Sequence, residues 1–179
     1  MTKYHKLFQR KYLIFLDIDG VLASSRVHCA HNADQTYGLW ARLDPVAMDF
    51  FNRIHDTHPV EFVVMSTWKN HLAADNNGIL HWVQSAFQNS GFRGRLADPW
   101  KTDPEEIGMF NRWDRANEVL DYLGKYASDV DDYLLFDDNR YQFEELMPKK
   151  RLILTDPNNG LLYKQMQKAL SIMGQWDKR

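Results

Sequence analysis

Short apolar runs recur along the chain, and polar or turn-forming residues follow each of them. The first run, YLIFL at residues 12–16, carries no charged residue. This pattern is typical of a strand covered on both faces in a parallel sheet rather than of a half-exposed strand. Similar runs predict strands at residues 60–65, 132–136 and 151–155, and a shorter strand is expected to end near Leu96.

Helical spacing of apolar residues fills most intervals between these strands. Residues 44–55 predict a helix with Asp44 as its N-cap and Pro45 in its first turn. Strands that alternate with helices are typical of an α/β fold, here a three-layer Rossmann-like parallel sheet with helices on both faces. Further helices are expected at residues 71–88, 111–126 and 161–173.

Length and composition favour an ordinary globular protein. The 179 residues are expected to form one domain spanning residues 1–179. A formal net charge of −2 argues against strong sequence-independent binding of nucleic acid, because such binding needs many Lys and Arg residues. The lone Cys29 permits no internal disulfide and is typical of a reducing compartment. We therefore expect a soluble, cytoplasmic protein with no membrane association and no obligate protein partner.

Four carboxylates and one hydroxyl follow the expected strands. They belong to Asp17, Asp19, Ser66, Asp137 and Asp138. Ligands of open α/β sheets bind where the carboxyl ends of the strands converge, and crowded carboxylates there need a positive partner. Mg²⁺ prefers such oxygen ligands. One carboxylate can attack phosphorus, and a second carboxyl group can protonate the leaving oxygen.

Three motifs in order along the chain resemble signatures of the haloacid dehalogenase (HAD) superfamily of phosphohydrolases. They are FLDIDGVL, VVMS and YLLFDDN. The resemblance implies that Asp17 is the nucleophile, that Asp19 is the general acid and base, and that Ser66 holds the transferring phosphoryl group. It also implies a Mg²⁺ site formed by Asp137 and Asp138 together with Asp17 and Asp19, with Asp138 favoured as the direct ligand.

The third HAD signature is a basic residue that neutralises the nucleophile and the phosphate. The stretch RANEVLDYL resembles the corresponding helix of small capless phage-type and RNA-repair-associated members, which implies this role for Arg115. Arg112 and Lys125 are the alternatives.

Substrate selection is expected to come from two loops, because neither interval between the motifs has room for a sizeable cap domain. Residues 23–43 contain Tyr37 and Trp40, and residues 97–109, expected to be a loop because of their prolines, contain Trp100 and Lys101. Aromatic rings in an open site suit stacking against a nucleobase. The residues assigned to substrate binding are thus Trp40, Trp100 and Lys101, with Gly20 and Thr67 beside the first two motifs.

Several alternatives stay open at this point. Ser66 and Thr67 can also cap the element that follows them. A zinc site at His28, Cys29 and His31 is disfavoured, because no second pair of ligands has suitable spacing. The expected function is a Mg²⁺-dependent phosphomonoesterase acting on a nucleotide or nucleic-acid terminal phosphate. A sugar-phosphate or other small-metabolite phosphatase, and a catalytically silent binding protein, are the rival hypotheses.

Overall fold

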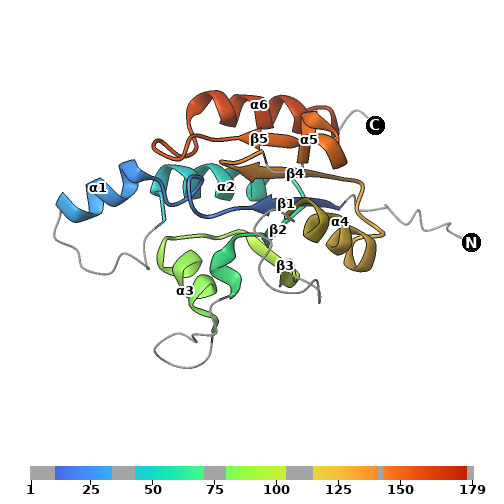
Figure 1. Cartoon of the computed structure of the whole chain (residues 1–179), viewed down its shortest axis with the longest axis horizontal. Coiled ribbons are helices and arrows are strands. Elements are labelled where there is room, and N and C mark those ends of the chain that lie inside the picture. Colours follow the sequence, from blue (N-terminus) through green and yellow to red (C-terminus); the bar gives the residue numbers. More distant parts are fainter. Residues whose placement is uncertain (1–10, 34–42, 71–79, 104–114, 141–142, 177–179) are drawn as a thin grey trace, which may run out of the picture.

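The computed structural model describes residues 11–33, 43–70, 80–103, 115–140 and 143–176, without the side chains of residues 31–33. These residues form a five-stranded, fully parallel sheet in the order β3-β2-β1-β4-β5. Figure 1 shows the strands following one another in this order, from β3 near the bottom to β5 near the top. The strands are β1 Tyr12–Leu16, β2 Val60–Val64, β3 Arg95–Lys101, β4 Asp132–Asp137 and β5 Leu152–Leu154.

Strand β1 lies at the centre of the sheet and is buried along its whole length. Alternate side chains of a strand point to opposite faces. Tyr12, Ile14 and Leu16 accordingly join one hydrophobic cluster, and Leu13 and Phe15 join another. The sequence-based prediction that both faces of this strand are covered is confirmed.

Helices cover both faces of the sheet (Figure 1). The first cluster includes buried residues of α2 (Pro45–Thr57), α3 (Trp82–Asn89) and α6 (Tyr163–Met173), and the second includes those of α4 (Arg115–Tyr126) and α5 (Phe143–Leu146). The predicted three-layer α/β architecture is confirmed. Both clusters contain sheet residues, so the described part of the chain holds no separate core of a cap domain. None of its helices is long and apolar enough to span a membrane.

Helix α1 (Ser25–Ala33) occupies part of the interval that the sequence predicts as a loop, so that prediction is wrong there. Among its described side chains only Val27 is buried, which explains why no apolar periodicity marks it. Tertiary contacts hold the helix instead. Arg26 forms an ion pair with Asp44, whose carboxylate also caps α2 by accepting from the Val46 N–H. The predicted N-cap role of Asp44 is confirmed.

Strand β3 also differs from expectation, because it includes Trp100 and Lys101, which the sequence places in a loop. It is an edge strand, and its pairing with β2 shifts register between Phe62 and Val64. Edge strands and bulges tolerate proline, which explains how Pro99 fits within it.

Helix α3 is shorter than the predicted helix at residues 71–88, of which residues 71–79 lie outside the described ranges. It begins after His81, whose ring accepts from the Val83 N–H, while the Gln84 side chain accepts from the His81 N–H. This reciprocal cap closes the start of the helix. Two short 3₁₀ helices complete the described elements, η1 Thr67–Asn70 and η2 Lys149–Arg151.

Candidate active site

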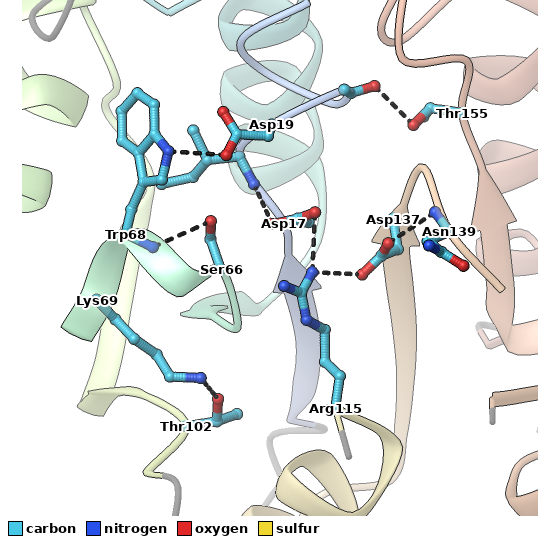
Figure 2. A network of polar contacts seen from close by, with 12 residues as sticks. Asp17, Asp19, Ser66, Trp68, Lys69, Thr102, Arg115, Asp137, Asn139 and Thr155 are labelled. Atoms are coloured by element: carbon cyan, nitrogen blue, oxygen red, sulfur yellow. Dashed lines mark hydrogen bonds and ion pairs between the residues drawn. The ribbon is translucent and has the colours of Figure 1, made fainter. Parts of the chain in front are cut away.

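The carboxyl ends of β1, β2 and β4 bring the motif residues together. Leu16 lies opposite Val64 on one side and Phe136 on the other, so the residues that follow these positions converge. The Asp17 N–H donates to the Phe136 carbonyl oxygen at 2.9 Å, which extends the pairing one step beyond the strand. Figure 2 shows the resulting group of polar side chains.

Arg115, the first residue of α4, lies between two carboxylates (Figure 2). One guanidinium nitrogen is 2.8 Å from Asp17 Oδ2 and 2.9 Å from Asp137 Oδ2. All three residues are buried, so the guanidinium offsets the repulsion between two carboxylates that water screens poorly. The other oxygen of Asp137 accepts from the Asn139 N–H at 2.8 Å.

The alternatives to Arg115 differ in their placement. Lys125 lies near the other end of α4, about 15 Å along the helix axis, and pairs with Asp121 at 3.0 Å. Arg112 lies outside the described residues. Of the two candidates that the structure describes, Arg115 is the one that contacts Asp17.

Asp17, Asp137 and Asp138 form a group that can hold a metal ion, with one carboxylate oxygen from each lying within 4.8 Å of the others. Burial and the charge of Asp17 raise the pKa of Asp137 to about 8 and also raise the pKa of Asp138, while Arg115 opposes both shifts. These raised pKa values reflect burial and the crowding of three carboxylates that a single guanidinium does not neutralise. An all-oxygen set of this charge fits Mg²⁺.

Asp19 stands apart from this group, although the resemblance includes it in the metal site. Its Oδ2 accepts from the Trp68 indole N–H at 2.9 Å, as Figure 2 shows. Partial desolvation and the charge of Asp17 raise the pKa of Asp19, and the Trp68 hydrogen bond and the charge of His28 oppose this shift. A raised pKa suits a carboxyl group that must give up a proton near neutral pH.

Gly20 lets the chain turn tightly beside the aspartates. Its φ is +70°, and a Cβ there would lie 2.3 Å from Asp138 Oδ2. Its carbonyl oxygen accepts from the Thr155 hydroxyl at 2.8 Å. Gly20 therefore adopts a left-handed backbone conformation and approaches Asp138 so closely that a side chain at this position would clash with it. Its place in the site follows from backbone geometry.

Ser66 is fully buried at the start of η1, and Thr67 beside it is exposed. The Ser66 hydroxyl oxygen accepts from the Trp68 N–H at 3.4 Å, and its carbonyl oxygen accepts from the Lys69 N–H at 3.2 Å. The local capping role is therefore present, and in the view of Figure 2 Ser66 lies between Trp68 and Asp17.

Lys69 is a buried residue of this region that sequence reasoning did not single out. Its Nζ donates to the Thr102 hydroxyl at 2.8 Å and forms an ion pair with Glu118. Thr102 in turn donates to Glu118 at 2.9 Å. Burial lowers the pKa of Lys69, and the charge of Glu118 opposes this shift. Because Glu118 lies one turn beyond Arg115, the network ties η1 and the end of β3 to the helix that carries Arg115.

Aromatic residues extend from the site toward the edge strand. The Trp68 and Trp82 rings lie 4.7 Å apart between centroids, and His81 and Trp100 lie 5.0 Å apart. The Lys101 ammonium lies 5.9 Å from the Trp100 ring centroid. The other residues expected at the substrate, Tyr37 and Trp40, lie outside the described residues, as does the His31 side chain.

The comparisons with known proteins agree with the geometry. Residues 13–166 match the family described as the HAD domain in Swiss Army Knife RNA repair proteins. No curated protein and no solved structure matches the chain. The family match covers most of the 179 residues and includes all three motifs and Arg115. The chain therefore belongs to the HAD domain family of the Swiss Army Knife RNA repair proteins.

Proposed function

We propose that this protein is a Mg²⁺-dependent phosphomonoesterase that acts on the terminal phosphate of a nucleotide or nucleic acid. The observation that carries the proposal is the buried Arg115 bridge between Asp17 and Asp137, with Asp138 beside them. This arrangement supports the proposal, because the carboxylate that we propose as the nucleophile lies beside a fixed positive charge and candidate metal ligands. The family, whose members occur in RNA repair proteins, supports a phosphorylated nucleic-acid substrate.

The proposed reaction has two half-reactions at Asp17. A carboxylate oxygen of Asp17 forms a bond to phosphorus while the ester P–O bond breaks, and Asp19 gives its proton to the departing oxygen. Water then attacks the aspartyl-phosphate, Asp19 takes a proton from that water, and inorganic phosphate leaves with the Asp17 carboxylate restored. Asp17 is held for this attack, since its Oδ1 accepts from the Ile18 N–H at 2.8 Å and its Oδ2 contacts Arg115.

Besides the nucleophile, the proposed reaction requires positive charge around the phosphoryl group. Asp17, Asp137 and Asp138 would hold Mg²⁺, which when bound supplies positive charge against the phosphoryl oxygens. Arg115 adds a permanent charge from the protein side, and the Ser66 hydroxyl can donate to a phosphoryl oxygen. These donors are fixed before substrate arrives, as electrostatic catalysis requires.

Removing the metal should abolish turnover, and adding Mg²⁺ should restore it. Asp138→Ala should raise the Mg²⁺ concentration needed for half-maximal rate by about 10- to 100-fold, because even residues that only orient metal ligands contribute this much to affinity. The measurement is the initial rate against free Mg²⁺ after EDTA treatment. His28→Ala is the matched control and should change this midpoint little. A larger effect at His28 than at Asp138 would replace the magnesium assignment with a histidine-containing site.

The substrate class is tested with Trp100, whose partly buried ring lies beside Lys101 at the carboxyl end of β3. Stacking on an aromatic side chain is worth ~1–3 kcal/mol per base, so Trp100→Ala should lower kcat/KM for a nucleotide or oligonucleotide phosphate by about one to two decades. p-Nitrophenyl phosphate, which reaches only the Asp17 pocket, should be hydrolysed as before.

The control for this experiment is Tyr126→Ala, because Tyr126 is exposed at the far end of α4 from Arg115. It should leave all substrates unaffected. Unchanged nucleotide hydrolysis in Trp100→Ala, or a preference of the wild-type protein for hexose phosphates, would favour the small-metabolite phosphatase instead.

A further inference from the structure

We infer that Trp68 is a positioning residue for the general acid, because its indole N–H holds the Asp19 carboxylate toward the leaving group and away from the aspartate group. The inference rests on the proposed phosphatase function and deepens it. It assigns a role in catalysis to a residue that lies outside the three sequence motifs.

The position of Asp19 is the first observation. Asp19 is two residues from Asp17, yet it is not part of the group formed by Asp17, Asp137 and Asp138. It is exposed at the surface, where an unrestrained carboxylate would rotate. Among the described residues, the indole of Trp68 is the side chain that donates a hydrogen bond to this carboxylate, at 2.9 Å.

The rigidity of Trp68 is the second observation. The residue is 7% exposed and belongs to the hydrophobic cluster shared by the sheet and α2, and its ring packs against that of Trp82. Its own backbone N–H points to the Ser66 hydroxyl. A packed side chain with little freedom places its donor in one direction, which is how a supporting residue fixes a catalytic group. Trp68 thereby links the phosphate-binding Ser66 to the acid.

The hydrogen bond also distinguishes the two oxygens of Asp19. An indole N–H can only donate, so Asp19 Oδ2 acts as the acceptor. The transferable proton is therefore carried on Oδ1. In the first half-reaction Oδ1 gives this proton to the ester oxygen as the P–O bond breaks, and in the second it takes one from the attacking water.

Trp68→Phe tests the inference, since it keeps an aromatic ring and removes the N–H. An alkyl phosphate needs protonation to leave, whereas p-nitrophenolate leaves without it. Because general acid catalysis is typically worth 10²–10⁴-fold, we expect kcat for an alkyl or nucleoside phosphate to fall about 10- to 100-fold and kcat for p-nitrophenyl phosphate to fall less than about 3-fold. Trp82→Phe is the matched control for lost indole packing and should leave the ratio of the two rates unchanged.

A double-mutant cycle separates positioning from packing. In an Asp19→Asn background, Trp68→Phe should cause no further loss for the alkyl phosphate, because Trp68 acts only through Asp19. If Trp68→Phe folds poorly, Trp68 can be replaced by benzothienylalanine, which is isosteric with tryptophan and lacks the N–H. This replacement gives the same comparison with the shape of the side chain preserved.

Three outcomes would overturn the inference. Equal losses of kcat for the alkyl and aryl phosphates, or additive losses in the double-mutant cycle, would mean that Trp68 supports only the fold. In either case, turnover by the wild-type protein would leave the phosphatase proposal intact. Absence of phosphomonoesterase activity in the Mg²⁺-loaded wild-type protein would instead remove the proposed function, and the inference with it.

Discussion

Asp17→Asn is expected to lower the rate of phosphate release by roughly 10⁴-fold or more, the scale seen when a nucleophile is removed from an enzyme. An amide cannot attack phosphorus to form the aspartyl-phosphate. The loss should be the same for alkyl and aryl phosphates, because the nucleophile is needed whatever the leaving group. This uniform loss distinguishes Asp17 from Asp19. Steady-state rates on both substrate types measure it.

The fold should survive this substitution. The amide oxygen can still accept from the Ile18 N–H, and Arg115 keeps its contact with Asp137. The thermal unfolding midpoint of Asp17→Asn should therefore stay close to that of the wild-type protein. Substantial activity in a correctly folded Asp17→Asn protein would contradict the assignment of Asp17 as nucleophile.

Arg115→Met is expected to have a large effect on both activity and stability. It removes the positive charge between two buried carboxylates, Asp17 and Asp137. Breaking a buried ion pair by deleting one partner typically costs about 3–5 kcal/mol, because a buried charge is left uncompensated. We expect the free energy of unfolding of the metal-free protein to fall by about this amount, as measured by denaturant titration. Turnover should also be lost even at saturating Mg²⁺.

Lys125→Met is the matched control on the same helix. Lys125 forms a partly exposed pair with Asp121, and such pairs contribute about 0.3–0.5 kcal/mol. Its removal should leave stability and turnover nearly unchanged. The reverse pattern, with loss of activity in Lys125→Met and full activity in Arg115→Met, would move the third motif to Lys125.

The parts of the fold that the sequence predicts well are those with strong local signals. The uninterrupted apolar residues of β1 predict a strand covered on both faces, and Asp44 followed by Pro45 marks the start of α2. Helix α1 lacks such a signal, because most of its described side chains are exposed and Arg26 secures it through a distant partner. In β3, the edge position and the register shift accommodate a proline that locally favours a loop.

The candidate site likewise contains residues that the sequence predicts and residues that it does not. Motif spacing places Asp17, Ser66, Asp137 and Asp138 at the carboxyl ends of their strands, and the strand order, with β2 and β4 on either side of β1, brings those ends together. The contacts of Trp68 and Lys69 cannot be read from spacing, because each depends on a partner that tertiary packing brings close. Trp68 reaches back to the loop after β1, and Lys69 reaches the helix that carries Arg115.

The central claim is that the reaction passes through a covalent phosphoryl group on Asp17. Borohydride reduces an acyl phosphate to an alcohol, so trapping the protein during turnover should convert Asp17 into homoserine, which peptide mass spectrometry detects. We predict this conversion at position 17 only when substrate and Mg²⁺ are both present, and none in Asp17→Asn. Turnover without reduction at position 17, or with reduction at another carboxylate, would contradict the claim.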